Sequence, residues 1–380
     1  MSCAASLLGE IVANHYAVGE LVDCRRLSLG YVNVSYVIET ATDGERKKYF
    51  LREYKRGIRE EEIVFEHSVI EHLVSKGFDL VAGVIATRDG MTFVKRFEGG
   101  DGEVEKGPVF YALFDFLPGE DRYTWVNPTC NDEELANAAS VLARFHIAVS
   151  DLIPAGKRYE PKILHMLPII AENVERGAGR GGRTEFDAYL RGNLDLILEN
   201  INHTLQAIDE KAYESIVHQV IHCDYHPGNL KFQDSQITGL FDFDWSKVDA
   251  RCFDLALAIT YFCTAWEGER DGHLDLRKAA LFLRAYRNAL ESSSEVRPLN
   301  EIELKLLPWM ISASNIYVLN WTVEDFYGRE ADPNEYLIYL RHGVRMMRWL
   351  EDDRNRDQLQ RMIAGAGVGH ELYRTFDRSS

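Results

Sequence analysis

The patterning of hydrophobic residues changes near residue 113, and this change limits the folds that the chain can adopt. Before it, short runs of β-branched and aromatic residues alternate with turn signals such as TDGE at 42–45, which is typical of antiparallel strands. One helical stripe, at about 59–76, interrupts these runs. From about residue 120 onward helical spacing dominates. The sequence therefore predicts an α+β fold of two lobes, an antiparallel β-rich lobe with one long helix and a mainly helical lobe.

Local signals place the individual elements. A short β interruption at 219–243 breaks the helical part, where two apolar pieces flank the turn QDSQ and predict a hairpin. The segment RGAGRGGR at 176–183 spells GxGxxG, but a polar, helix-prone stretch precedes it in place of a strand, so we interpret it as an inter-helix loop. We expect strands at 32–40, 47–54, 83–87, 90–97 and 108–116, and helices at 59–76, 133–151, 186–217, 274–293, 301–327 and 334–351.

Composition narrows the range of partners. The 380 residues carry a formal net charge of -17, which argues against a nucleic-acid backbone or an anionic membrane, because both attract clustered Lys and Arg. The chain has no apolar run long enough for a transmembrane helix, and its start, MSCAASLLGEIVANHY, lacks the basic segment of a signal peptide. The six cysteines form no CxxC pair, which fits a reducing compartment. We expect a cytoplasmic protein with neither nucleic acid nor membrane as partner.

Residues 221–231, IHCDYHPGNLK, gather several ligand-type side chains within a few positions. The hairpin around QDSQ would bring Asn229 beside Asp242 at its open end, with Asp224 on the loop just before it. An oxygen-only pair of Asn and Asp suits Mg²⁺, which proteins usually hold with few side chains plus substrate phosphates. A separate Asp upstream can accept the proton of an attacking hydroxyl. Phosphoryl transfer needs this layout, because positioning and charge neutralisation supply most of its catalysis.

The run from His222 to Asn229, followed by FDFDW with Asp242 and FDLA with Asp254, resembles the aminoglycoside phosphotransferase family. This family includes homoserine kinases of the second type, choline kinases and N-acetylhexosamine kinases, all with a protein-kinase-like fold of two lobes. The resemblance implies that Asp224 is the catalytic base, that Asn229 and Asp242 bind Mg²⁺, and that His222 and Asp254 brace the catalytic loop. It also implies an ATP- and Mg²⁺-dependent kinase with a small-molecule hydroxyl acceptor.

The β lobe carries further matching segments. LGYVNVSY at 29–36 resembles the phosphate-covering loop of the family, with Gly30 and Asn33 near its tip. Arg52 in YFLREY stands where members more commonly have a Lys, and a guanidinium can hold phosphate oxygens with two parallel hydrogen bonds. The family pairs this residue with a Glu on the following helix. We expect Glu66, because it lies on the inward stripe where an unpaired carboxylate is costly, and Glu62 is the second choice.

The segment YALFDFLPGE resembles the hinge between the two lobes of the family. The backbone of Phe114, Asp115 and Phe116 is therefore expected to meet the adenine. The resemblance divides the chain into a nucleotide-binding β lobe at 1–113, a hinge at 114–119 and a helical lobe at 120–380, which holds the catalytic loop at 219–254 and the acceptor-binding helices.

Three alternatives use the same residues. His222, Asp224 and His226 alternate along an extended segment as the ligands of a zinc hydrolase would, but that interpretation leaves Asn229 unexplained and lacks a second His/Asp cluster to complete the site. A catalytically inactive, nucleotide-binding regulator on the same fold stays open. A protein-directed kinase is disfavoured because DFD replaces DFG. Asp244 is either a ligand of a second metal ion or a solvated carboxylate.

The acceptor pocket is expected in the helical lobe, at YFCTAWEGE and NIYVLNWTVEDFYGRE. Aromatic walls with a few carboxylates suit a sugar, through ring stacking and hydroxyl hydrogen bonds, and equally an amino or quaternary-ammonium alcohol, through cation–π contact. Amino alcohols, homoserine-like molecules, aminoglycosides and hexosamines or other sugars all stay open as acceptors. Ordinary helix packing explains each of these side chains equally well. The candidates are Trp266, Glu267, Tyr317, Asn320, Trp321 and Asp325.

Overall fold

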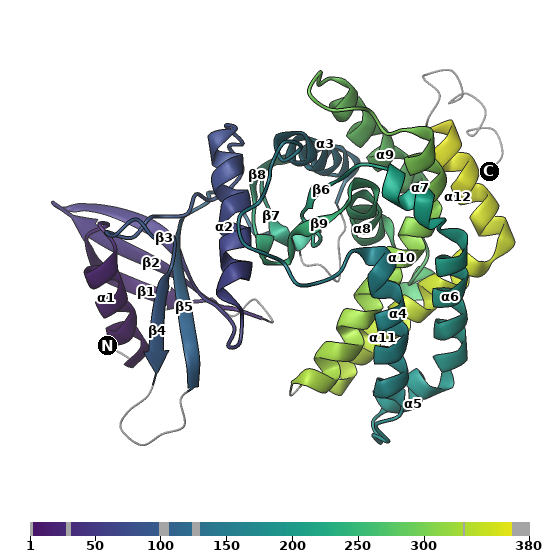
Figure 1. The fold of residues 1–380 in the computed structure, drawn as a ribbon, viewed down its shortest axis with the longest axis horizontal. Coiled ribbons are helices and arrows are strands. Elements are labelled where there is room, and N and C mark those ends of the chain that lie inside the picture. The colour runs from purple at the N-terminus through teal and green to yellow at the C-terminus, as the bar shows by residue number, and fades with distance from the viewer. Residues whose placement is uncertain (1–2, 28–31, 99–105, 124–129, 330, 367–380) are drawn as a thin grey trace. The chain divides into compact units, whose positions relative to one another are not determined.

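The computed structural model describes residues 3–27, 32–98, 106–123, 130–329 and 331–366, and it divides into two compact units that we describe one at a time (Figure 1). An antiparallel sheet dominates the first unit and helices dominate the second, so the predicted α+β fold class is confirmed. The first unit comprises Met1–Glu120, Leu152–Tyr159 and Thr238–Asp244, and the second comprises Asp121–Asp151, Glu160–Ile237 and Trp245–Ser380.

The first unit is built on a five-stranded antiparallel sheet in the order β1-β2-β3-β5-β4. Asp43 and Gly44 join β2 to β3, and both have positive φ, at 52° and 87°, as a tight hairpin turn that follows the twist of the strands requires. The strands are β1 (Glu20–Arg26), β2 (Val34–Thr42), β3 (Glu45–Glu53), β4 (Val94–Glu98) and β5 (Lys106–Asp115).

One expected strand in this unit is wrong. Residues 83–87 form a single bridge, between Val84 and Phe114, and two backbone hydrogen bonds with β5, from Ile85 N to Leu113 O at 2.8 Å and from Asp115 N to Gly83 O at 2.9 Å. The segment contacts the C-terminal end of β5 at these points but forms no continuous ladder with it. The β-branched residues of GVIAT are therefore explained by burial beside β5, and they do not form a strand of their own.

Two helices accompany the sheet. The helix α1 (Cys3–His15) was not predicted from the sequence; its Leu8, Ile11 and Val12 join the apolar core of the sheet. Figure 1 shows α1 beside the strands. The expected helix at 59–76 is α2 (Glu60–Ser75), which begins with three glutamates that interact favourably with the helix dipole.

The second unit contains ten helices in the part of the chain that the structure describes, of which the 28-residue α10 is the longest. Figure 1 shows them as the teal, green and yellow part of the ribbon. They are α3 (Asp132–Ala148), α4 (Ile163–Ala178), α5 (Glu185–Gly192), α6 (Leu194–Ala207), α7 (Glu210–Ser215), α8 (Arg251–Cys263), α9 (Leu276–Glu291), α10 (Glu301–Gly328), α11 (Pro333–Glu351) and α12 (Asp353–Gly365).

The single helix expected at 186–217 is wrong, because the chain breaks it into α5, α6 and α7. Asn193, at φ -120°, leaves the helical conformation between α5 and α6. Asp209 caps α7 by accepting a hydrogen bond from Ala212 N. Both are residue types whose short polar side chains compete with helical hydrogen bonding. The helices α4, α8 and α12 were not expected, and every residue of α8 is buried, so it lacks the polar face that marks a surface helix.

The β interruption contains short strands and a turn of 3₁₀ helix. β6 (His218–Ile221) pairs antiparallel with β9 (Lys247–Ala250). β7 (Leu230–Gln233) pairs with β8 (Gln236–Leu240) around a turn in which Asp234 has φ 53°, as QDSQ predicted. The 3₁₀ turn η1 (Pro227–Asn229) lies between β6 and β7.

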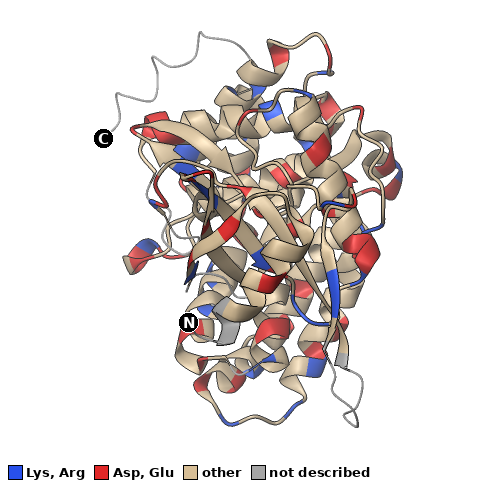
Figure 2. Ribbon diagram, turned by 90° about the vertical axis from the view of Figure 1, so that its left-hand side faces the viewer, with Lys and Arg blue, Asp and Glu red and all other residues tan. Residues whose placement is uncertain are grey.

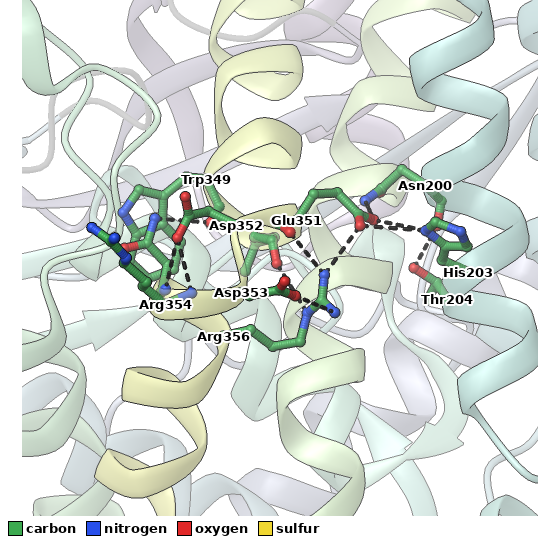
Figure 3. Close-up of polar contacts among 11 residues, drawn as sticks. Asn200, His203, Thr204, Trp349, Glu351, Asp352, Asp353, Arg354 and Arg356 are labelled. Atoms are coloured by element: carbon green, nitrogen blue, oxygen red, sulfur yellow. Dashed lines mark hydrogen bonds and ion pairs between the residues drawn. The ribbon is translucent and has the colours of Figure 1, made fainter.

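An ionic cluster joins α6, α11 and α12 (Figure 3). Glu351 accepts hydrogen bonds from Asn200 Nδ2 at 2.8 Å and from Arg356 Nη2 at 3.1 Å, and His203 Nδ1 lies 3.3 Å from the same carboxylate. Arg356 Nη2 also donates to the backbone carbonyl of Glu351, which ties the start of α12 to the end of α11.

Charged residues of both signs are interspersed along the ribbon (Figure 2). Within the described ranges, no helix is both long and apolar enough to cross a membrane.

Candidate active site

Asp254 holds the backbone of the predicted catalytic loop. Its Oδ2 accepts a hydrogen bond from His222 N and its Oδ1 one from Cys223 N, both at 2.9 Å. His146 Nε2 lies 2.9 Å from Oδ2. Burial raises the pKa of Asp254, but the hydrogen bonds and charges of His146 and His222 together outweigh it, so the net shift is downward. The first turn of α8 thereby fixes the residues that precede Asp224, in the bracing position that the resemblance implied.

Cys223 has a left-handed backbone, with φ 64°. Non-glycine residues rarely adopt this conformation, and outside turns it stores strain that surrounding structure must hold. The other non-glycine residues with positive φ in the described ranges are Asp43 and Asp234, which lie in hairpin turns, and Asp242 at φ 67°. The two strained positions outside hairpin turns therefore fall in the two segments that the motif singled out.

The Asp224 carboxylate is held by its neighbours on the same loop. Asn229 Nδ2 donates to Asp224 Oδ2 at 2.9 Å and to the Asp224 carbonyl at 2.9 Å. His226 Nε2 lies 3.5 Å from the same Oδ2. Burial raises the pKa of Asp224, but the charge and hydrogen bonding of His226, His222 and Asn229 lower it further than burial raises it. Asp224 is therefore ionised at neutral pH and ready to accept a hydrogen bond from a hydroxyl.

The imidazoles of the same loop are engaged with backbone groups. His222 Nδ1 accepts from Asp224 N at 3.3 Å, and His226 Nδ1 accepts from Gly228 N at 3.0 Å. A zinc ion would need a free ring lone pair at each histidine. The described residues also contain no group of three His, Cys, Asp or Glu side chains arranged to hold a metal. The hydrogen bonding thus disfavours the zinc hydrolase alternative.

In the first unit, Arg52 lies between two carboxylates. Its Nη1 donates to Glu66 Oε1 at 2.9 Å and its Nη2 to Asp242 Oδ1 at 2.8 Å. The expected Arg52–Glu66 pair is thus present, whereas Glu62 pairs with Arg158 at 3.4 Å. Tyr54 OH also donates to Glu66, at 2.8 Å. This network fixes the guanidinium between β3 and the segment that carries Asp242.

Burial sets the protonation in this network. It raises the pKa of Glu66 to about 7, and the charge of Arg52 only partly opposes that rise. Burial also lowers the pKa of Arg52, but Asp242 and Glu66 together outweigh it and the net shift is upward. Arg52 is therefore a permanent cation in a buried position, and its Nε makes no hydrogen bond with the described residues. An unpartnered buried donor of this kind fits a phosphate oxygen.

The other residues predicted for the nucleotide site lie in different surroundings. Asn33 Nδ2 donates to Asp244 Oδ2 at 2.7 Å, and Asn33 Oδ1 accepts from Lys55 N, so Asn33 links the loop before β2 to the DFD segment. Phe114 and Asp115 end β5, and Asp115 pairs with Lys47 at 3.3 Å. Phe116 is half-exposed just beyond the strand. Gly30 lies outside the described residues.

The acceptor candidates do not all have free polar groups. Asp325 contacts Arg329 and Tyr336, and Tyr317 OH donates to Glu160 Oε1 at 2.8 Å. Asn320 Nδ2 donates to Glu324 and its Oδ1 accepts from Asn173. The ring of Trp266 stacks on His342, with 3.4 Å between the ring centroids, and the ring of Trp321 stacks on Tyr336. Glu267 is exposed and precedes a 3₁₀ turn. Their role in acceptor binding stays a prediction.

A buried cation at the start of β9 was not predicted from the sequence. Lys247 is 1% exposed, and its Nζ lies 2.9 Å from Glu160 and 3.3 Å from Asp249. Glu160 also accepts from Tyr317 OH, which in turn lies 3.6 Å from Cys223 Sγ. The spacing of Lys247 and Asp249 could have indicated this pair, because residues two positions apart on a strand face the same side.

Comparison with known proteins identifies the family. Residues 23–291 match the model of the phosphotransferase enzyme family. The chain belongs to this family. A homoserine kinase of Parvibaculum lavamentivorans is 27% identical over 336 residues, which cover 86% of this chain and 90% of that relative. The family predicted from the motif is therefore confirmed, and so is the expectation of an ATP-dependent small-molecule kinase.

Solved structures agree on the fold. A choline kinase from Cryptosporidium parvum Iowa II has a TM-score of 0.61 at 13% identity, covering 94% of this chain and 99% of that one. The amicoumacin kinase hAmiN, in complex with AMP-PNP, Ca²⁺ and Ami, has a TM-score of 0.59 at 14% identity, covering 95% and 92%. At these identities the structures establish the protein-kinase-like fold alone.

Proposed function

We propose that this phosphotransferase uses ATP and Mg²⁺ to phosphorylate a hydroxyl group of a small molecule, with L-homoserine as the first acceptor to test. The observation that carries the proposal is the catalytic loop, in which a strained Cys223 and the Asp254 clamp present an ionised Asp224 beside Asn229. Homoserine is favoured because two relatives, each matched by this chain over 90% of its own length, are named homoserine kinase.

Asp224 orients the acceptor hydroxyl in this proposal. Its lowered pKa makes it a weak base at neutral pH, so it accepts a hydrogen bond from the hydroxyl and takes the proton late, as the phosphoryl group arrives. The Oδ1 oxygen is suited to this role, because Oδ2 is the oxygen that Asn229 and His226 contact.

The residues that would hold the metal are Asn229 and Asp242. Both offer oxygen ligands, the type that Mg²⁺ prefers. The amide orientation of Asn229 is fixed by its two donated hydrogen bonds, so its Oδ1 faces the opposite side of the amide from Asp224. Asp242 is about one-third exposed and held by Arg52 at one oxygen. Bound there, Mg²⁺ would neutralise charge on the phosphates.

Arg52 would contact the nucleotide phosphates through Nε, which has no hydrogen-bond partner in the described part of the chain, and through the fork that Glu66 orients. Asn33 and the backbone of 114–116 complete the proposed nucleotide site, as the resemblance implied.

The test is ADP release from Mg-ATP with a panel of acceptors, namely L-homoserine, choline, ethanolamine, spectinomycin and N-acetylglucosamine. Asp224→Asn serves as the blank, because it is isosteric and cannot act as a base. We expect acceptor-stimulated ADP release with the wild type, at least 100-fold lower in Asp224→Asn, on the lower end of the scale for a general base of roughly 10²–10⁴. Mg-ATP binding without turnover on any acceptor would support the inactive regulator instead.

A further inference from the structure

The imidazole of His226, on the catalytic loop, contacts the Asp224 carboxylate, with Nε2 3.5 Å from Oδ2. It is 9% exposed and packs on the Tyr261 ring, with 5.3 Å between the ring centroids. From the sequence alone, His226 is expected to be a loop-packing residue, apart from its place in the zinc alternative.

The hydrogen bonding fixes which nitrogen carries the proton. Gly228 N donates to His226 Nδ1 at 3.0 Å, so in the neutral ring Nδ1 holds the lone pair and Nε2 holds the hydrogen. That Nε2–H lies 3.5 Å from Asp224 Oδ2. Hydrogen bonds of catalytic groups are commonly long without substrate and shorten in the substrate complex.

We propose that His226 is a positioning residue for Asp224: its Nε2–H and the Asn229 amide hold Oδ2 from two directions and leave Oδ1 for the acceptor hydroxyl. With Asn229 alone, one hydrogen bond fixes one oxygen and the carboxylate can turn about its last torsion, which is broad for Asp. A second donor on the same oxygen restricts that rotation. The inference rests on the proposed function, because it assigns Oδ1 to the acceptor.

The two ring nitrogens of His226 make different contacts, and two substitutions test these contacts separately. His226→Asn keeps an acceptor near the Nδ1 position for Gly228 N but removes the donor that faces Asp224. His226→Gln keeps a donor near the Nε2 position and loses the acceptor. If orientation of Asp224 matters, the Gln variant is more active than the Asn variant. If His226 only supports the loop, the order is reversed.

The experiment measures kcat and KM for Mg-ATP and for whichever acceptor of the panel the wild type phosphorylates fastest. We expect kcat of His226→Asn to fall by tenfold or more, toward the roughly 10²-fold that a misplaced catalytic group costs, with KM for ATP unchanged. His226→Gln should recover most of kcat. The control is His165→Gln, since His165 is exposed on α4. Equal kcat values in the Asn variant and the wild type would overturn the proposal, as would a Gln variant less active than the Asn variant.

Crystal structures of the wild type and His226→Asn decide the matter independently of any acceptor. We expect the Asp224 carboxylate to turn away from its wild-type orientation in the variant, while η1 keeps its conformation. A carboxylate that keeps both its orientation and its contact with Asn229 would refute the role of His226. A wild type that phosphorylates nothing in the panel would instead count against the proposed function, and the pair of structures would still test His226.

Discussion

The sharpest prediction concerns Asp254, because its carboxylate is fully buried and accepts hydrogen bonds from three donors. We consider Asp254→Asn, which preserves the shape and turns one acceptor oxygen into an NH₂ group. Whichever way the new amide faces, its nitrogen meets a donor: Cys223 N on one side, or His222 N and His146 Nε2 on the other. The substitution therefore breaks at least one hydrogen bond to a charged acceptor and brings two donors together.

The magnitude follows from these contacts. Hydrogen bonds to charged groups contribute about 1.5–3 kcal/mol each, and breaking a buried charged network commonly costs about 3–5 kcal/mol. We expect Asp254→Asn to lower the free energy of unfolding by about 3–5 kcal/mol. Because the lost contacts hold the two residues before Asp224, kcat should also fall by more than tenfold under conditions where the variant is still folded.

Asp275→Asn is a matched control. Asp275 also accepts two backbone hydrogen bonds, from Arg277 N and Lys278 N, but it does so as the N-cap of α9 and is only partly buried. Asn caps helices about as well as Asp, so the free energy of unfolding should change by less than about 1 kcal/mol. Urea unfolding followed by circular dichroism gives both values. A difference below about 1 kcal/mol between the two variants would refute the assignment of Asp254 as the brace of the loop.

Three further predictions concern buried ionisable side chains. Burial lowers the pKa of His67 from its usual 6.5 to about 3, so the unfolded chain binds the extra proton first and stability falls as pH drops below 6.5. The effect is at most about 1.4 kcal/mol per pH unit. Between pH 6.5 and 5, the free energy of unfolding of His67→Gln, measured in urea, should therefore fall by about 2 kcal/mol less than that of wild type. Glu66→Gln should raise KM for ATP several-fold with a smaller effect on kcat, because it loosens the fork of Arg52; an unchanged KM would separate Arg52 from the nucleotide. Lys247→Met should destabilise the chain by about 3–5 kcal/mol, since it leaves the buried Asp249 and the partly buried Glu160 without their cation, and a thermal midpoint equal to that of wild type would contradict this.

The parts of the site that could be predicted are those set by local spacing. The run HCDYHPGN places Asp224 and Asn229 on one short loop, and a loop of this length brings such residues into contact. Glu66 was predictable because a helical stripe of period 3.6 identifies the inward face of α2. In both cases the information lies within one element or one turn of the chain.

What escaped prediction depends on partners distant in sequence. Lys247 reads as a surface lysine until Glu160, from a separate segment, and Tyr317, on α10, are placed around it. The helix α8 was missed for a related reason: it is buried on all sides, so its sequence has no polar face and no period to detect. The strand expected at 83–87 failed in the opposite way, since burial beside β5 produced a strand-like composition without a ladder.

The choice of arginine at position 52 becomes clear from the contacts that surround it. A lysine there has a single nitrogen to share among a helix carboxylate, a second carboxylate and a phosphate. Arg52 donates from Nη1 to Glu66 and from Nη2 to Asp242, and its buried Nε has no hydrogen-bond partner within the described ranges. A guanidinium can therefore stay anchored to α2 while it contacts a new anion, because separate nitrogens make the separate contacts. The departure from the commoner lysine thus fits a site in which the cation must join Asp242 to the helix as well as receive the nucleotide.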